Sequence, residues 1–387
     1  MLPKKLNKKL QERKAKNAFR QLGSNSNLVD FSSNDYLGFS QSQEIYEATH
    51  NYLKTQGLQK NGATGSRLLS GNLKLYRSLE ALLCKFYNCE ASLVFNSGYS
   101  ANIGFFSCVP QRNDIILYDE LVHASIRDGI TMSHAKSYKF KHNDLEDLEA
   151  MILRFNFDKL SLTTQNNTPD IYVVTESVFS MDGDTPNLIA LSQLCTTNNL
   201  NLVIDEAHAI GVFGKYGEGL IKDLGLEQHV FARIITFGKA LGCHGAAVLG
   251  SEQLINYLIN FSKPFIYTTA LSPHSLATII MAFEELATTI QRKKLKENIE
   301  FFKTEVSLLK LQEVFINSES AIQCCIISGN DHIKSISNKL HENGFDVKAI
   351  LSPTVLKGKE RLRFCLHSYN TKQEIKDVLQ LLKRMLT

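Results

Sequence analysis

Short runs of β-branched and other apolar residues alternate with segments of helical length between about residues 75 and 250. Strands joined by helices form right-handed βαβ units, which build a largely parallel sheet covered by helices on both faces. We therefore predict an α/β fold with a mostly parallel central sheet. The predicted strands lie in ASLVFNSG, NDIILYDE, DIYVVTES, NLVIDEAH, RIITFGK and GAAVLGS.

Each of these runs ends in polar or small residues. In an open α/β sheet, ligands bind at the carboxyl ends of the strands. We therefore expect the polar residues at these ends to converge on one crevice. They are Ser97, Asp119, Glu176, Asp205 and Lys239.

The pattern changes after about residue 270. A long, charged helical stretch is followed by the shorter strand-like runs AIQCCIIS, FDVKAI and RLRFCLHS and by a closing amphipathic helix. This order predicts a smaller α+β domain at the C-terminal end. We expect an N-terminal helix and arm over residues 1–45, a large α/β domain that carries this ligand crevice over 46–270, and the small domain over 271–387.

The composition is that of an ordinary globular protein, with 43% hydrophobic and 21% charged residues. No uninterrupted apolar stretch is long enough to cross a bilayer, so we expect no membrane association. The net charge of +4 comes largely from the basic N-terminus, where Leu2, Leu6, Leu10 and Phe19 have roughly helical spacing. We interpret this segment as an amphipathic helix with a solvated basic face and expect no nucleic-acid partner.

The eight cysteines form neither a C-x-x-C pair nor a finger-like arrangement with histidine. We therefore expect no metal site. Most of the cysteines lie in apolar surroundings, where a free thiol behaves as a small hydrophobic side chain. This usage favours a reducing, cytoplasmic location.

Lys239 lies between the apolar run IITF and a row of glycines and alanines. A lysine that loses solvation in such a crevice is a competent Schiff-base nucleophile. Asp205 ends an earlier strand, with His208 three residues later. Alone, Asp205 could equally cap the next helix, with His208 an ordinary surface residue. A lysine Schiff base combined with an aspartate on a ring nitrogen is the arrangement that pyridoxal phosphate uses, so the pair predicts this cofactor.

The same cofactor needs an anion site and a group over its ring. The segment NSGYSANIG places Ser97, Gly98 and Tyr99 at a strand-to-helix turn, where free backbone N–H groups favour a phosphate. His123 follows a strand and is a candidate for the ring face, although an isolated histidine is more often structural. The hydroxyl candidates, individually unspecific, are Ser180 and Thr236.

Taken together, these segments resemble the α-oxoamine synthases, a group of fold-type I pyridoxal phosphate enzymes. The resemblance covers nearly the whole chain, and its segments occur in the order of that family. They are DFSSNDYLGFS, GATGSRLLSGN, FNSGYSANIG, DELVHAS, VVTESVFSMDGD, VIDEAHAIGVFG, TFGKALGCHGAAVLGS, IYTTALSP and RLRFCLHS.

The resemblance implies that Lys239 bonds covalently to the cofactor and that His123 stacks on its ring and faces the substrate. It implies further that Asp205 pairs with the ring nitrogen and His208 with the phenolic oxygen. These four residues are the expected catalytic set. The other expected cofactor contacts are Ser97, Gly98, Tyr99, Ser180, Thr236, Thr268 and Thr269.

The last two of these threonines lie in IYTTALSP, which resembles the segment that reaches a neighbouring subunit's phosphate. The resemblance therefore implies a homodimer with shared sites. It also implies that Asn34 and Arg363 bind the amino-acid carboxylate, for which a planar guanidinium is well suited. Arg361 is a close alternative, and an ordinary strand salt bridge is the alternative role for Arg363. The acyl substrate is expected to contact Arg20 and Thr354.

The implied reaction is the decarboxylative condensation of an amino acid with an acyl thioester. The nearest branch, which serves biotin synthesis, implies L-alanine and a pimeloyl thioester of coenzyme A or acyl-carrier protein. Branches that use glycine or serine are the alternatives. One departure concerns Leu351 and Ser352, because relatives carry an arginine just before the Pro-Thr-Val segment. This departure bears on the acyl chain and not on the cofactor.

A nucleotide-binding module is the alternative from another class, since it also combines strands, glycines and helices. The chain lacks G-x-x-x-x-G-K-[ST], and GKALGCHG places the lysine before the glycines instead of after them. Both observations favour the enzyme.

Overall fold

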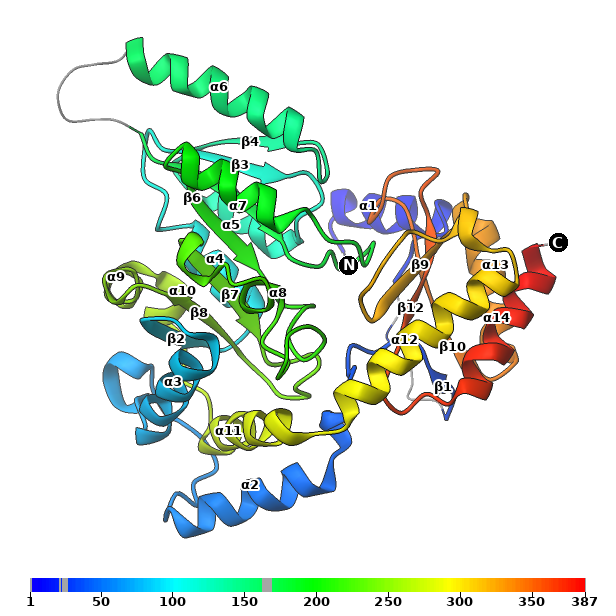
Figure 1. Cartoon of the computed structure of the whole chain (residues 1–387), viewed down its shortest axis with the longest axis horizontal. Coiled ribbons are helices and arrows are strands. Elements are labelled where there is room, and N and C mark those ends of the chain that lie inside the picture. Colours follow the sequence, from blue (N-terminus) through cyan, green and yellow to red (C-terminus); the bar gives the residue numbers. More distant parts are fainter. Residues whose placement is uncertain (1, 21, 23–26, 162–168, 387) are drawn as a thin grey trace. The chain divides into compact units, whose positions relative to one another are not determined.

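The structure is a computed structural model that describes residues 2–20, 22, 27–161 and 169–386. Contacts between Cα atoms divide the chain into two compact units (Figure 1). Unit 1 comprises Met1–Tyr36, Ser180–Asp184 and Lys293–Thr387, and unit 2 comprises Leu37–Phe179 and Thr185–Arg292.

Unit 2 contains the central sheet and the helices that cover it. Its strands are β2 (Ala91–Phe95), β3 (Ile115–Asp119), β4 (Lys136–Phe140), β5 (Ile171–Glu176), β6 (Asn201–Asp205), β7 (Ala232–Thr236) and β8 (Ala246–Gly250). Its helices are α2 (Gln43–Thr55), α3 (Lys74–Tyr87), α4 (Gly98–Phe106), α5 (Ala124–Met132), α6 (Leu145–Ser161), α7 (Leu188–Thr197), α8 (Leu220–Asp223), α9 (Glu252–Phe261), α10 (Lys263–Ile266) and α11 (Pro273–Thr288). Short helical turns are η1 (Phe39–Gln41), η2 (Arg67–Gly71) and η3 (Glu227–His229).

The seven strands are arranged in the order β2-β8-β7-β6-β5-β3-β4. The pairs from β7 to β4 are parallel, whereas β8 is antiparallel to both of its neighbours. All strands except β8 therefore point the same way. The predicted mostly parallel α/β sheet is confirmed.

Both faces of the sheet are buried, as neighbouring residues of β5 illustrate. Tyr172 and Val174 join a cluster with residues of α4, α5 and α9, whereas Ile171 and Val173 join a cluster with residues of α6, α7 and α8. Successive side chains of a strand point to opposite faces, so a strand covered on both sides must be apolar throughout. This burial explains the continuous apolar runs of the sequence.

Unit 1 has two small sheets of its own. In one, β1 pairs with β10 in parallel, and the other has the antiparallel order β11-β12-β9. The strands are β1 (Val29–Asp30), β9 (Ile322–Ile326), β10 (Phe345–Asp346), β11 (Lys348–Ile350) and β12 (Arg361–Cys365). The helices are α1 (Lys4–Ala15), α12 (Gln291–Leu308), α13 (Asn330–Glu342) and α14 (Lys372–Leu386), with a short turn η4 (Gln312–Val314).

The structure differs from the sequence-based expectation at three elements. Strand β4, with the sequence KSYKF, was not predicted, because its two lysines interrupt the apolar pattern. Strand β8 follows β7 after a short loop instead of a helix, which is why it runs antiparallel. The long helical stretch after residue 270 is two helices, α11 and α12, because Thr289 has an extended backbone.

The N-terminal helix forms as α1, but none of its residues is buried. Leu6 and Leu10 are 48% and 42% exposed, so its leucines do not enter a core of this chain. By contacts, α11 belongs with α2 and α3 in unit 2. The predicted domain boundaries near residues 45 and 270 stay predictions. In the described part of the chain, no helix has the length and apolarity needed to cross a membrane.

A buried ion pair fixes β6 to β7. The Arg233 guanidinium donates to Oε2 of Glu206 through Nη2 at 2.6 Å and Nε at 2.9 Å, and the two side chains are 3% and 0% exposed. We expect Arg233→Met to lower the free energy of unfolding by about 3–5 kcal/mol, because the Glu206 charge would stay buried without its partner. Urea denaturation monitored by circular dichroism measures the change.

Lys293→Met is the matched control, because Lys293 lies 3.9 Å from Glu297 in a pair whose side chains are 82% and 49% exposed. Solvent screens such a pair, so the expected change is below about 1 kcal/mol. An equal loss of unfolding free energy in both variants would contradict the expectation that burial makes the loss of an ion-pair partner costly.

Candidate active site

The carboxyl ends of the parallel strands bring the predicted polar residues to one edge of the sheet in unit 2. Glu176, Asp205 and Thr236 are the last residues of the adjacent strands β5, β6 and β7. Since these strands are parallel, their last residues lie at the same edge. Lys239 follows three residues after the end of β7.

Asp205 begins a hydrogen-bond network that leads to His123. Its Oδ1 accepts from the backbone N–H of Ala207 at 2.9 Å, and its Oδ2 accepts from Nδ2 of Asn102 at 2.9 Å. The same amide donates to Oγ of Ser125 at 3.0 Å, and this oxygen lies 2.7 Å from Nδ1 of His123. Two predicted cofactor residues are therefore connected by a buried amide and a buried hydroxyl.

Asn102 and Ser125 were not among the residues predicted from the sequence. The asparagine in GYSANIGFF, an otherwise largely apolar stretch, could have indicated a buried polar contact. Asn102 is 2% exposed and Ser125 is 1% exposed. A buried polar side chain in a helix is costly unless it is hydrogen-bonded, so it indicates a partner elsewhere in the fold.

His123 is held in its neutral form. Desolvation by neighbouring atoms lowers the pKa of His123, the negative charge of Asp205 opposes this shift, and the positive charge of Lys239 adds to it. The backbone N–H of Ser125 also donates to Nδ1 of His123 at 3.2 Å, which makes Nδ1 an acceptor. These interactions place His123, Asp205 and Lys239 in one electrostatic cluster.

Glu176 supports the backbone of His123. Its Oε1 accepts from the His123 N–H at 2.5 Å, and the side chain is fully buried within unit 2. Burial raises the pKa of Glu176 well above its ordinary value, and the negative charge of Asp205 raises it further. Glu176 is therefore a neutral carboxyl group.

Lys239 lies in the tight loop between β7 and β8. It is half-buried, and its Nζ is 3.4 Å from Oγ1 of Thr236. Gly242, at φ +61°, donates its N–H to the Lys239 carbonyl at 2.8 Å, and Cys243 donates to the Phe237 carbonyl at 2.7 Å. The loop therefore keeps the lysine at the strand end.

The first turn of α4 lies against Thr236. Ser97 caps this helix by accepting from the Ser100 N–H at 3.1 Å. A Cβ atom on Gly98 would lie 2.6 Å from Cγ2 of Thr236, so only glycine allows this approach. The hydroxyl of Tyr99 donates to Asp128 at 2.6 Å.

The remaining predicted residues of unit 2 are placed as follows. His208 is buried three residues beyond the end of β6. Thr268 is half-buried and Thr269 is exposed, with the Thr269 carbonyl accepting from Asn96 at 2.7 Å. Asp119, by contrast, pairs with Nδ1 of His142 at 3.0 Å and is structural. Among the described residues, no cluster of histidine, cysteine and acidic side chains could hold a metal ion.

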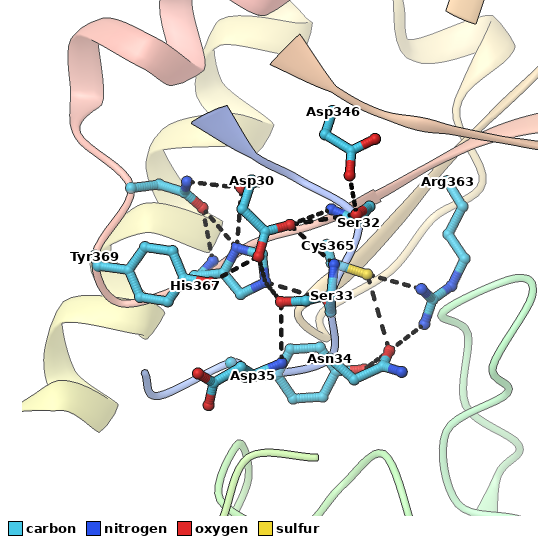
Figure 2. Close-up of polar contacts among 12 residues, drawn as sticks. Asp30, Ser32, Ser33, Asn34, Asp35, Asp346, Arg363, Cys365, His367 and Tyr369 are labelled. Atoms are coloured by element: carbon cyan, nitrogen blue, oxygen red, sulfur yellow. Dashed lines mark hydrogen bonds and ion pairs between the residues drawn. The ribbon is translucent and has the colours of Figure 1, made fainter. Parts of the chain in front are cut away.

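Unit 1 contains the residues expected to bind the substrates. Nη2 of Arg363 donates to Oδ1 of Asn34 at 2.9 Å, and Nε of Arg363 donates to the Ser180 carbonyl at 2.7 Å (Figure 2 shows Arg363 and Asn34). Ser180 thus belongs to the same unit as the predicted carboxylate pair. Arg20 donates to Oγ1 of Thr354 at 3.5 Å.

Arg361 and Arg363 differ in their partners. Arg361 forms an ion pair with Asp182 and donates to the Met181 carbonyl at 3.0 Å. Arg363 is 6% exposed and bonds to neutral groups, and no carboxylate among the described residues forms an ion pair with it. The charge of Arg361 is therefore already balanced by Asp182, whereas the hydrogen-bond partners of Arg363 are neutral.

A family model described as aminotransferase class I and II matches residues 26–382. The chain belongs to this family. Proteins of this family are pyridoxal phosphate enzymes, so the predicted cofactor and the predicted enzymatic character are confirmed.

The sequence relatives agree with the expected resemblance to α-oxoamine synthases. An 8-amino-7-oxononanoate synthase of Emericella nidulans is 40% identical over 374 residues, covering 92% of this chain and 88% of the relative. A putative 8-amino-7-oxononanoate synthase of Methanococcus vannielii is 36% identical and covers 97% of each chain. The resemblance is confirmed.

Solved structures of family members have the same fold. The 8-amino-7-oxononanoate synthase of Francisella tularensis is 29% identical, with a TM-score of 0.76, and covers 93% of this chain and 98% of its own. A serine palmitoyltransferase of Sphingomonas wittichii is 25% identical, with a TM-score of 0.88, and covers 100% of this chain and 98% of its own. The predicted fold type is therefore confirmed.

The residues at the sheet edge fit the family's cofactor. Each oxygen of Asp205 accepts one hydrogen bond, which leaves lone pairs for a protonated ring nitrogen. The capped N-terminus of the nine-residue helix α4 offers N–H groups to a phosphate. The missing side chain at Gly98 lets this turn pack against Thr236, and Lys239 places its amine 3.4 Å from Oγ1 of the same threonine.

The neutral state of Glu176 makes a pH-dependent prediction. In the folded protein, the pKa of Glu176 is raised above the ordinary 4.5. The protonated carboxyl group therefore stabilises the fold fully below pH 4.5. This stabilisation is lost as the pH rises towards the folded pKa. Glu176→Gln imitates the neutral acid and cannot ionise. We expect its stability relative to the parent protein to increase as the pH is raised above 4.5.

Urea denaturation of both proteins at several pH values from about 5 to about 9 measures this difference in the free energy of unfolding. Glu176→Ala is the comparison, because it removes the acceptor of the His123 N–H and should cost about 1–3 kcal/mol. A stability difference between Glu176→Gln and the parent that does not change with pH would argue against a neutral Glu176.

Proposed function

We propose that this enzyme condenses L-alanine with a pimeloyl thioester to give 8-amino-7-oxononanoate, CO2 and the free thiol, a step of biotin synthesis. The observation that carries this proposal is the 40% identity, over 92% of the chain, to a protein named 8-amino-7-oxononanoate synthase. The polar cluster at the sheet edge supports the same class of chemistry.

Asp205 and Lys239 form the centre of the proposed mechanism. Bound pyridoxal phosphate supplies a ring that accepts negative charge from the amino-acid Cα. Asp205 would keep the ring nitrogen protonated, and the Asn102 amide holds Oδ2 of Asp205 in place. Lys239 would bind the cofactor covalently and, once displaced by the amino acid, remove the Cα proton as a general base.

The neighbouring residues would orient the cofactor. His123, neutral and linked to Ser125, would lie over the ring and face the substrate. His208 would donate to the phenolic oxygen, with Thr236 and Ser180 close by. Ser97, Gly98 and Tyr99 would contact the cofactor from the first turn of α4.

Arg363 and Asn34 would bind the amino-acid carboxylate. A guanidinium presents two parallel N–H donors to a carboxylate, and burial strengthens such a pair. Arg363 is favoured over Arg361 because Asp182 already balances the charge of Arg361. The carboxylate is the group that leaves as CO2, so its orientation decides which Cα bond is aligned for cleavage.

Arg20 and Thr354 would receive the acyl substrate, and their hydrogen bond supports a common role. The half-buried Leu351, where relatives carry arginine, offers no charge to a distal carboxylate. The acyl carrier is coenzyme A or acyl-carrier protein. Thr268 and Thr269 would reach the phosphate site of a second subunit, so we propose a homodimer with shared sites. The cytoplasmic location stays a prediction.

A serine- or glycine-using α-oxoamine synthase is the second candidate. The structural likeness to a serine palmitoyltransferase, with a TM-score of 0.88, favours it. The sequence relatives favour L-alanine, because the compared proteins of 36–40% identity are named 8-amino-7-oxononanoate synthases.

Mass spectrometry of the products distinguishes these candidates. The purified, cofactor-loaded enzyme is incubated with L-alanine, glycine and L-serine in competition, together with pimeloyl-coenzyme A. We expect 8-amino-7-oxononanoate as the predominant product. A product that contains the carbons of glycine or serine would refute the proposed function while leaving the cofactor site intact.

Lys239→Ala tests the proposed attachment of the cofactor. We expect turnover to fall by at least about 10³-fold, because the variant lacks both the nucleophile and the general base. Borohydride should fix the cofactor to the parent protein and not to the variant, as intact-mass spectrometry can measure. Lys215→Ala, at an exposed lysine of the same unit, is the control and should behave as the parent. Trapped cofactor in Lys239→Ala would assign the attachment to another lysine.

A further inference from the structure

A second polar network in unit 1 surrounds the segment that carries Asn34. Oδ1 of Asp30 accepts from the backbone N–H groups of Ser32 at 2.8 Å and Ser33 at 2.9 Å, and Oδ2 accepts from the hydroxyl of Tyr369 at 2.9 Å (Figure 2). Asp30 therefore folds the chain into a turn immediately before Asn34.

His367 holds the other side of this turn. Its Nε2 lies 3.1 Å from both Oγ and the carbonyl oxygen of Ser33, and its Nδ1 lies 3.1 Å from the carbonyl oxygen of Asp30. Oγ of Ser33 in turn accepts from the Asp35 N–H at 3.3 Å. The ring thus contacts the chain on both sides of the turn, and Asn34 lies directly between Ser33 and Asp35.

The partners of His367 surround both of its ring nitrogens. Each nitrogen lies within hydrogen-bond distance of a backbone carbonyl oxygen, Nδ1 of Asp30 and Nε2 of Ser33. Oδ1 of Asn370 also faces Nδ1 at 3.1 Å and accepts from the His367 N–H at 2.8 Å, which fixes the orientation of that amide. His367 is 0% exposed, so these contacts lie in the interior of unit 1.

Asp30 lies beside the His367 ring. Oδ2 of Asp30 lies 3.9 Å from Nε2 of His367. Burial alone would raise the pKa of Asp30, but the positive charge of His367 and hydrogen bonds from Ser33 and Ser32 outweigh it and lower the pKa to about 2. The Tyr369 ring stacks on the His367 ring, with centroids 4.6 Å apart and planes 8° from parallel.

The segment held in this way orients the side chain that bonds to Arg363. Oδ1 of Asn34 accepts from Arg363 at 2.9 Å and from the hydroxyl of Tyr36 at 3.2 Å. Arg363 and His367 come from β12 and the residues that follow it, and Cys365 between them donates its N–H to the Phe31 carbonyl at 2.8 Å. Ser368 donates its N–H to the Tyr36 carbonyl at 2.9 Å, so the two segments are joined both before and after Asn34.

We propose that His367 is a positioning residue: its buried ring holds residues 30–35 so that Asn34 and Arg363 present one preformed site to the amino-acid carboxylate. The proposal rests on the proposed function of these two residues. It assigns to His367 a role in recognising the carboxylate and none in recognising the amine or the acyl thioester.

The test compares two amines on the holoenzyme loaded with pyridoxal phosphate. L-alanine has a carboxylate, and isopropylamine is a similarly small amine without one. Binding of each is measured from the change in the cofactor's visible absorption. We expect His367→Gln to weaken L-alanine binding about tenfold, because a single amide cannot replace the contacts that the two ring nitrogens make with the carbonyls of Asp30 and Ser33. Isopropylamine binding and the KM for pimeloyl-coenzyme A should change less than about twofold.

His332→Gln is the matched control, because it makes the same substitution at an exposed histidine of unit 1. It should leave both amines unaffected. A folded His367→Gln protein with unchanged L-alanine binding, or with equal losses for L-alanine and isopropylamine, would overturn the proposal. Thermal melting by circular dichroism verifies folding.

Ser33→Ala keeps the proposal testable if His367→Gln does not fold. This variant removes only the hydroxyl that joins Nε2 of His367 to the Asp35 N–H. We expect L-alanine binding to weaken about threefold, again without an effect on isopropylamine. Unchanged L-alanine binding in Ser33→Ala would also overturn the proposal.

Arg363→Lys separates this inference from the proposed function. If Arg363→Lys leaves L-alanine binding unchanged, the proposed carboxylate site is wrong, and the inference falls with it. If Arg363→Lys weakens L-alanine binding but His367→Gln and Ser33→Ala do not, only the positioning role of His367 is wrong.

Discussion

The parallel direction of neighbouring strands is the constraint on which the candidate active site depends. Because β5, β6 and β7 run the same way, their last residues, Glu176, Asp205 and Thr236, meet at one edge of a sheet that is buried on both faces. Polar groups in such surroundings must find partners within the protein. The hydrogen bonds between Asp205, Asn102, Ser125 and His123 satisfy this requirement, and they give the site a defined arrangement before any ligand is present.

Two carboxyl groups at this edge have different surroundings. Asp205 accepts two N–H hydrogen bonds. Glu176 is fully buried near the negative charge of Asp205, so its pKa is raised and it stays neutral. The neutral Glu176 fixes the backbone of His123 without adding a second negative charge.

Unit 1 uses buried polar groups in a different way. There His367 and Asp30 hold a turn, while the Arg363 guanidinium has neutral partners. A guanidinium without a counter-ion attracts an anion. In the proposed function, this guanidinium binds the amino-acid carboxylate.

Much of the fold and part of the site could be predicted from the sequence, because both depend on local patterns. Apolar runs with polar ends identify parallel strands and place Asp205 and Lys239 at the sheet edge. The pattern did not predict β4, because two lysines interrupt its apolar residues. It also did not predict the direction of β8, which depends on the short loop after β7. It also could not separate Arg361 from Arg363, since residues two apart on a strand share one face.

Partners from distant parts of the chain decided what the sequence left open. Asp182 balances Arg361 across 179 residues, Asn102 meets Asp205 across 103, and Ser33 meets His367 across 334. Periodicity reports which face of an element a residue occupies, but a hydrogen bond depends on where two elements pack. The sequence alone therefore determined the fold class, the cofactor and the residue types of the site, and the tertiary structure decided which of those residues are charged, neutral or available to a ligand.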